Sequence, residues 1–169
     1  MKKENIVNKQ LQDAVCKLIS EEYYAYKLYM LARLAVKADE KAVVDQLFSE
    51  ISDDELNDHL KMLVEWCRDY GVDVPCSEAE FKKAADGKIS KQVDYLKKNK
   101  DAAYYLQEGI TSEEAALASY KKILDMDEVH EFTDLQSALW KIYYDEEEHL
   151  RDLNTAKIAY DAGDGLVIG

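Results

Sequence analysis

Residues 135–153 read LQSALWKIYYDEEEHLRDL, and their periodicity decides the fold class. Steps of alternately four and three residues follow one face of an α-helix, because the helix has about 3.6 residues per turn. Along this stretch the steps land on Leu135, Leu139, Ile142, Glu146, His149 and Leu153. The stretch therefore predicts an amphipathic helix whose apolar stripe is interrupted by one carboxylate and one imidazole.

The same stepping pattern recurs in three other parts of the chain, each time with an acidic interruption. The interrupted stripes span residues 11–36 with Glu22, residues 44–62 with Glu55 and Asp58, and residues 106–124 with Glu113. We therefore expect four long amphipathic helices, at about residues 8–37, 40–70, 101–126 and 131–162.

The composition supports an all-α fold in a single domain of residues 1–169. The chain has one proline and six glycines, too few for the turns of an all-β protein, and its 47% hydrophobic content can fill a core. Residues 71–100 are long enough to cross the length of a helix bundle, and a short helix is expected after Ser77, a good N-cap residue. The sequence therefore predicts a four-helix bundle with one long crossover.

The charge balance and the cysteines exclude several classes of function. A net charge of −13 disfavours phosphate binding, so DNA binding is not expected, although Lys2, Lys3 and Lys9 lie near the start of the chain. The three cysteines form no C-x-x-C pair, which argues against a disulfide framework or a zinc ribbon and suits a cytoplasmic protein. No signal peptide and no membrane span are expected, because no apolar run is long enough.

An internal repeat relates the two predicted helical hairpins. Glu22 and Glu55 are 33 residues apart, and Glu113 and Glu146 have the same spacing. The repeat extends to tyrosines seven residues after the first glutamate of each pair, and to an Asp-Glu dipeptide at the second. We therefore expect two halves related by a pseudo-two-fold axis.

The interrupting residues point to a metal site. A carboxylate buried in an apolar stripe costs several kcal/mol unless it is paired or binds a cation. One such glutamate could face solvent, but four at a repeated spacing are expected to converge inside the bundle. His149 follows Glu146 by three residues on the same face, so one helix can offer both groups to one metal. Oxygen-rich ligation with nitrogen suits iron or manganese better than zinc.

These residues resemble the di-iron ferroxidase signature of the ferritin-like superfamily, over residues 8–160. The resemblance is closest to bacterioferritins and to Dps-like (DNA protection during starvation) proteins with a bacterioferritin-type site. It implies two iron ions per subunit, oxidation of Fe(II) by oxygen or hydrogen peroxide, and iron storage inside a homo-oligomeric cage. The resemblance makes Glu55 and Glu146 the bridging ligands and Glu22 and Glu113 the terminal ones, with His149 completing the catalytic set.

Two departures from that pattern concern the helix expected at residues 40–70. Where the pattern has a histidine three residues after the glutamate, this chain has Asp58, with His59 one position later. We expect Asp58 to be the ligand, with His59 as the alternative. Leu56 replaces the methionine that binds haem in bacterioferritins, so no haem is expected. The short crossover helix and a tail too short for a fifth helix resemble the 12-subunit Dps-like cages more than 24-subunit ones, so the resemblance implies a 12-mer.

The sequence therefore favours a ferroxidase in an iron-storing or peroxide-detoxifying cage. Two alternatives remain open at this point. The first is another di-metal carboxylate enzyme on the same bundle, such as an oxygenase or a manganese catalase. The second is a non-enzymatic helical protein whose metal site is vestigial.

Overall fold

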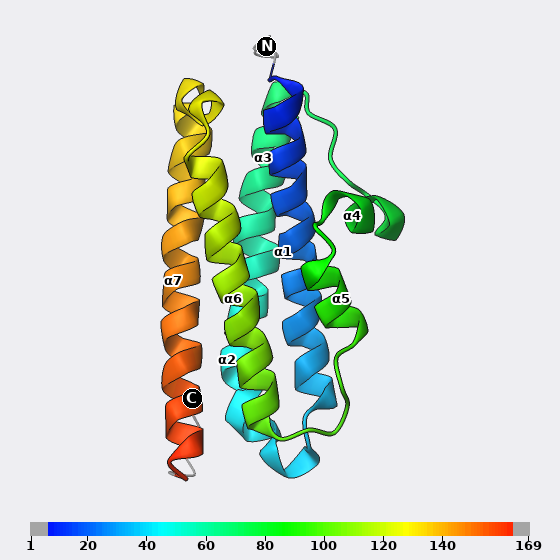
Figure 1. The fold of residues 1–169 in the computed structure, drawn as a ribbon, viewed down its shortest axis with the longest axis vertical. Helices are drawn as coiled ribbons and strands as arrows, with labels where there is room; N and C mark the ends of the chain where they lie inside the picture. The colour runs from blue at the N-terminus through cyan, green and yellow to red at the C-terminus, as the bar shows by residue number, and fades with distance from the viewer. Residues whose placement is uncertain (1–6, 164–169) are drawn as a thin grey trace.

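The computed structural model describes residues 7–163, which form an all-helical bundle without strands in that range. Long helical rods run along its length (Figure 1), and four are described. They are α1 (Lys9–Ala35), the continuous run of α2 (Lys41–Asp53), η2 (Asp54–Leu60) and α3 (Lys61–Tyr70), then α6 (Ala102–Leu124) and α7 (Thr133–Asp161). The predicted four-helix bundle is confirmed. The start of the chain, including Lys2 and Lys3, and the tail expected to lack a fifth helix from residue 164 onward lie outside the described residues.

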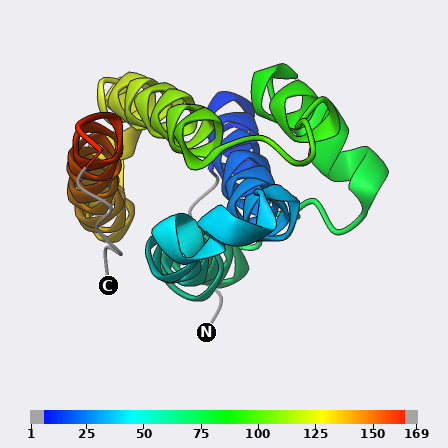
Figure 2. The same ribbon diagram turned by 90° about the horizontal axis from the view of Figure 1, so that it is seen from below.

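The four rods form two helical hairpins. The turn of 3₁₀-helix η1 (Ala38–Glu40) joins α1 to α2, and η3 (Asp127–Glu131) joins α6 to α7. The end-on view in Figure 2 shows the four rods around a common centre, with α6 beside α7 and α1 beside α2. No helix within residues 7–163 is both long and apolar enough to cross a membrane.

The crossover between the hairpins runs along the outside of α1 (Figure 1) and carries two short helices. The first, α4 (Glu78–Ala84), begins where predicted, because the Ser77 hydroxyl accepts a hydrogen bond from the Glu80 amide at 3.2 Å. The second, α5 (Lys88–Asp94), was not predicted. It is only seven residues long, and its apolar residues pack against the outer face of α1, a tertiary contact that periodicity cannot reveal.

Local signals set the ends of the long rods. The side chains of Asn8 and Asp101 accept hydrogen bonds from amides three residues on, and so begin α1 and α6. Gly71 ends α3 in the left-handed conformation, with φ of 69°, which glycine adopts without the steric cost that a Cβ brings. These signals explain why the rods begin and end where the periodic stripes do.

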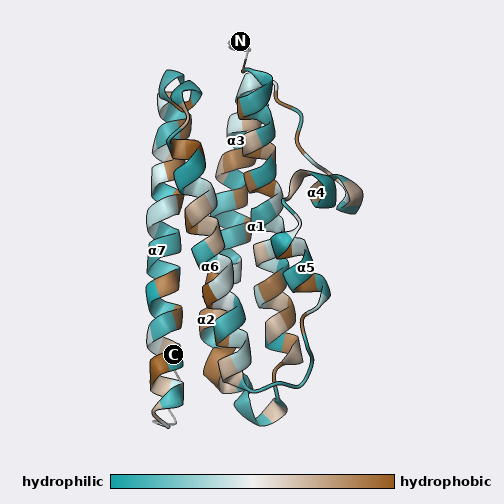
Figure 3. Cartoon of the chain, viewed as in Figure 1, coloured by the Kyte–Doolittle hydropathy of each residue, from teal (hydrophilic) through white to brown (hydrophobic). Residues whose placement is uncertain are grey.

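Two apolar clusters fill the interior of the bundle, one at each end, and a third, smaller cluster lies between α1 and the crossover. Of the two end clusters, one contains Leu11, Leu63 and Leu135, and the other contains Phe48, Leu106 and Leu153. Figure 3 shows apolar and polar residues alternating along every rod, in keeping with helices that bury one face. Between the two clusters lies a layer of buried ionisable side chains, and the packed ends hold this layer in place.

Candidate metal centre

Six ionisable side chains meet in the polar layer at mid-bundle. Each rod contributes one glutamate, and every one of these glutamates is at most 3% exposed. Two histidines, also buried, accompany them. The six residues are Glu22 on α1, Glu55 and His59 on η2, Glu113 on α6, and Glu146 and His149 on α7.

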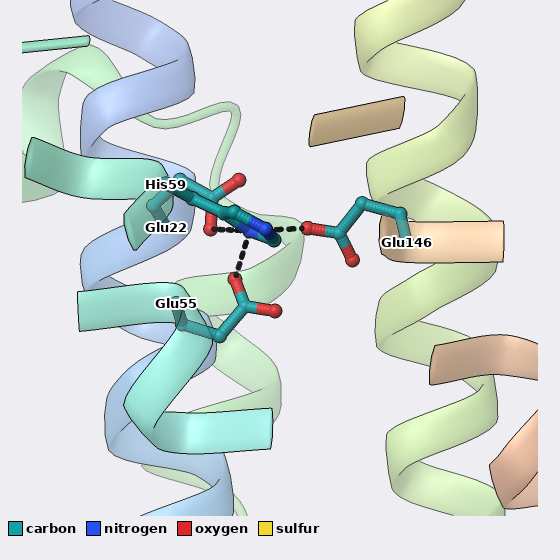
Figure 4. A group of neighbouring side chains, drawn as sticks. All are labelled: Glu22, Glu55, His59 and Glu146. Atoms are coloured by element: carbon teal, nitrogen blue, oxygen red, sulfur yellow. Dashed lines mark ion pairs between the residues drawn. The ribbon is translucent and has the colours of Figure 1, made fainter. Parts of the chain in front are cut away.

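The first half of the centre is built around His59 (Figure 4). Its Nδ1 atom lies 3.1 Å from Glu146 Oε1, 3.5 Å from Glu22 Oε2 and 3.7 Å from Glu55 Oε2. The three carboxylates reach this nitrogen from three different rods. One nitrogen and three oxygens within 4.8 Å of one another can hold one metal ion.

The second half is built in the same way around His149. Its Nδ1 atom lies 3.4 Å from Glu55 Oε1, 3.6 Å from Glu146 Oε2 and 3.7 Å from Glu113 Oε1. Glu55 and Glu146 therefore turn one oxygen toward each histidine, which is the arrangement of a bridging carboxylate. Glu22 and Glu113 each face one histidine only.

The hydrogen bonding of these atoms supports a metal-binding role. A buried polar atom without a partner costs roughly 1–3 kcal/mol, so natural cores contain few of them. Here such atoms gather at one place and point toward one another. The atoms of this centre without a hydrogen-bond partner among the described residues are Glu22 Oε2, Glu55 Oε1, His59 Nδ1, Glu113 Oε2, both oxygens of Glu146, and His149 Nδ1. Four carboxylates and two imidazole nitrogens fit two divalent cations, whose four charges would offset those of the glutamates.

Contrary to expectation, the structure brings His59, the alternative ligand, to this centre and leaves Asp58, the expected ligand, at the surface. Its side chain is 55% exposed and pairs with Lys141 at 3.6 Å, whereas His59 is fully buried. The reason is that residues 54–60 form a π-helix. The wider π-helical turn, with i→i+5 hydrogen bonds, places the residue four positions after Glu55 where an α-helix would place the third. His59 comes one position later than the histidine of the ferritin-like pattern, and the π-helical backbone brings its side chain to the centre nevertheless.

We predict that His59 and Asp58 differ in their effect on metal stoichiometry. His59→Ala should reduce the number of Co(II) or Mn(II) ions bound per chain from two to one, because it removes the histidine nitrogen of the first group. Asp58→Ala should keep the stoichiometry of two. Elemental analysis after dialysis against each metal measures the ratio. Loss of an ion in Asp58→Ala, with full binding in His59→Ala, would contradict this assignment.

Two buried tyrosines link the hairpins through the terminal glutamates. Tyr29 on α1 donates to Glu113 Oε1 on α6 at 2.6 Å, and Tyr120 on α6 donates to Glu22 Oε1 on α1. The two bonds are equivalent under the internal repeat, because each tyrosine donates to the glutamate of the other half. Burial, followed by the adjacent carboxylate, raises the pKa of both phenols well above 10, so they stay protonated and remain donors. The bond from Tyr120 leaves Glu22 Oε2 to face His59, whereas Glu113 Oε1 both accepts from Tyr29 and faces His149.

An aspartate lies behind each histidine. His59 Nε2 donates to Asp145 Oδ2 at 3.1 Å, and His149 Nε2 donates to Asp54 Oδ2 at 2.9 Å. The bond from His59 is the largest factor that holds the pKa of Asp145 down, at about 2. Such carboxylates keep the proton on Nε2 and direct Nδ1 toward a metal. Sequence reasoning missed this role, although the repeated Asp-Glu dipeptide was its signal.

The crowding of anions changes the protonation of the centre. Burial, with the charge of Glu22 next, raises the pKa of Glu55 to about 8. Burial and Glu146 likewise raise the pKa of Glu113 well above its usual range. Burial opposes the charged form of His59, but the carboxylates around it outweigh this and raise its pKa. Without a metal, protons therefore neutralise part of the repulsion in the centre.

We predict that metal binding is coupled to proton release. Glu55 is protonated below about pH 8 and a metal requires its ionised form, so affinity for Mn(II) should rise with pH between 5 and 8. Each proton released contributes about a tenfold gain in affinity per pH unit. Calorimetric titration in two buffers of different ionisation enthalpy counts the protons. A binding constant that is independent of pH, with no buffer effect, would contradict this expectation.

A cavity of about 30 Å³ borders the centre on the side covered by α5. All four glutamates line it, together with small or apolar residues such as Ala25, Ile89 and Ala116. One water molecule needs roughly 10–15 Å³ of such a cavity, so there is room for two or three molecules of that size.

Fold and site together define a ferritin-like helical bundle with a buried carboxylate–histidine centre that could hold two metal ions. The chain matches the ferritin-like domain model over residues 12–157, and it belongs to the ferritin family. The resemblance drawn from the sequence is thereby confirmed at the level of family and fold.

Several solved structures share this fold. A dodecameric thioferritin, the bacterioferritin-related protein from Bacteroides fragilis, matches with a TM-score of 0.78 at 23% identity, over 94% of this chain and 91% of that one. The DPS protein from Vibrio cholerae O1 gives a TM-score of 0.74 at 17% identity, over 87% and 88% of the two chains. A ferritin-like diiron-carboxylate protein from Bacillus anthracis str. Ames gives 0.67 at 20% identity, over 88% and 96%. No curated protein sequence matches the chain.

Proposed function

We propose that this protein is a ferroxidase that oxidises Fe(II) to Fe(III) and stores the product in a cage built from copies of the chain. The observation that carries the proposal is the centre with two bridging glutamates and one histidine for each of two metal positions. The bundle thus offers two adjacent ion sites with shared ligands, as a two-electron reaction on two one-electron donors requires.

Fe(II) is the substrate in this reaction, and two ions bind per turnover. Each ion gives up one electron, and the pair reduces one hydrogen peroxide with two protons to two waters, or one oxygen with two protons to hydrogen peroxide. The glutamates offset the charge of both ions and stabilise its increase during oxidation. Asp54 and Asp145 hold the two imidazoles so that Nδ1 remains available to iron.

The size of the adjoining cavity favours a small oxidant over an organic substrate. About 30 Å³ accommodates dioxygen or hydrogen peroxide, whereas pockets for drug-sized organic ligands measure roughly 300–1,000 Å³. This argues against the oxygenase alternative. A vestigial site is disfavoured as well, because both histidines and all four glutamates retain aligned, unpartnered atoms.

For the assembly we propose a 12-mer in the cytoplasm. The short crossover helices and the likeness to a dodecameric thioferritin support the 12-mer. The three cysteines in residues 7–163 are free, which suits a reducing compartment. Twelve chains of 19.4 kDa would give a particle of roughly 230 kDa.

The test is Fe(II) oxidation by the purified chain, with oxygen and then hydrogen peroxide as oxidant. The wild type should oxidise Fe(II) faster than buffer and retain Fe(III) in a particle of the dodecameric mass. Glu113→Ala, which removes a terminal ligand, should lose most of this rate. Oxidation that is unaffected by Glu113→Ala would refute the proposal, and dismutation of peroxide by the manganese-loaded protein alone would favour the catalase alternative.

A further inference from the structure

The surroundings of the two histidines differ in the charged groups that contact their supporting aspartates. Asp145 and Asp54 accept hydrogen bonds from His59 and His149 through a single oxygen each, and each precedes a bridging glutamate. Up to this point the two halves of the centre correspond. The two halves differ in the groups that contact these two aspartates.

Lys141 lies one turn before Asp145 on α7 and binds it. Its ammonium group contacts Asp145 Oδ2, the same oxygen that accepts the hydrogen bond from His59. Asp58, which the π-helix places at the surface, also pairs with this ammonium group, at 3.6 Å. Asp145 therefore shares one oxygen between an imidazole and a cation.

Among the described residues, the other half has no such cation. The residue one turn before Asp54 is Glu50, whose carboxylate accepts a hydrogen bond from Gln46 at 3.1 Å. Within the range 7–163, the ion pairing of Asp54 involves His149 alone. The internal repeat therefore places an acid where its partner half has a lysine.

A carboxylate that accepts the N–H of a ligand imidazole makes the ring a stronger electron donor to its metal. An ammonium on the same oxygen draws electron density away and offsets the negative charge of the carboxylate. Asp145 consequently strengthens His59 less than Asp54 strengthens His149. Lys141 is about half exposed, so solvent moderates the effect without removing it.

We propose that Lys141 is a positioning residue that makes the two metal positions unequal, acting through Asp145 on His59. The position at His149 binds a divalent cation first and more tightly, and the position at His59 binds second. This inference rests on the metal-binding part of the proposed function and is independent of whether Fe(II) is oxidised.

The experiment titrates the metal-free full chain with Co(II) and follows visible absorbance and heat. The wild type should bind in two steps, of which His149→Ala removes the tighter and His59→Ala the weaker. Lys141→Gln should strengthen the weaker step by roughly tenfold and change the tighter step by less than about twofold. Lys141→Arg, which keeps the cation, should restore the wild-type steps.

Lys157 provides a matched control on the same helix. It pairs with Asp161 at the same i,i+4 spacing, at 2.8 Å, away from the centre. Lys157→Gln should leave both Co(II) steps unchanged. The inference is overturned if Lys141→Gln leaves the weaker step unchanged, or shifts both steps equally. Two-step Co(II) binding in a protein that does not oxidise Fe(II) would instead refute the ferroxidase assignment and leave this inference standing.

Discussion

Replacement of Glu55 by glutamine should abolish Fe(II) oxidation while leaving the fold intact. Glu55 turns one oxygen toward each histidine, so its loss weakens both metal positions at once. Removal of residues that merely support metal ligands costs 10–100-fold, and loss of a shared ligand should lower the oxidation rate by about 100-fold or more. Stopped-flow oxidation measurements at saturating Fe(II) give the rate.

Stability should change in the opposite direction from activity. The folded-state pKa of Glu55, about 8, lies above its unfolded value, so the metal-free fold keeps a proton that the unfolded chain loses above about pH 4.5. Stability of the metal-free wild type therefore falls as pH rises from about 4.5 to 8. Glu55→Gln lacks this penalty and should be at least as stable at pH 7, and more stable at pH 8–9, in urea unfolding.

Glu50→Gln is the matched control for Glu55→Gln, because it makes the same change at an exposed position on the same rod. It should oxidise Fe(II) at the wild-type rate. Full activity in Glu55→Gln would show that the bridging geometry is dispensable. Unfolding of Glu55→Gln at neutral pH would show that the carboxylate serves stability instead.

Metal binding should stabilise the fold strongly. Two ions, each at 100 times its dissociation constant, together contribute about 5 kcal/mol to the free energy of unfolding. For a chain of 169 residues this corresponds to a rise in Tm of roughly 10–20 °C. The physical reason is that the ions replace repulsion among four buried carboxylates with attraction. Scanning calorimetry with and without Mn(II) measures the shift.

The double variant Glu55→Gln/Glu146→Gln is the control for this second experiment. It removes both bridging charges, so Mn(II) should raise its Tm by a few degrees at most. If the metal-free wild type has the same Tm as the metal-loaded protein, the buried carboxylates cost little folding free energy. Repulsion among the glutamates would then not be what the two ions relieve.

The periodic spacing of apolar residues in the sequence predicts much of this fold. The four interrupted stripes predict the four rods, since a helix that buries one face needs apolar residues at every third or fourth position. Carboxylates within those stripes predict a buried site, because each would otherwise cost several kcal/mol. The 33-residue spacing places the glutamates at one level of the bundle. These inferences depend on positions within single helices, and sequence records such positions directly.

The details of the centre depend on the local backbone conformation and on contacts between helices, which a short stretch of sequence does not reveal. The spacing of Glu55 to Asp58 matches an α-helix, yet a π-helical turn brings His59 inward instead. That turn is stable because it lets an imidazole fill the buried position and leaves the shorter aspartate in water. A rule based on 3.6 residues per turn cannot foresee this.

The sequence by itself determined the helices, the bundle and the four glutamates, because each follows from the burial of one face of a helix. Only the tertiary structure decided which histidine completes the centre, which aspartates hold the imidazoles, and that Lys141 contacts one half alone. These are contacts between rods distant in sequence, such as His59 with Asp145 and His149 with Asp54. Their free energy arises only when two rods meet, so no single stretch of the chain carries their signature.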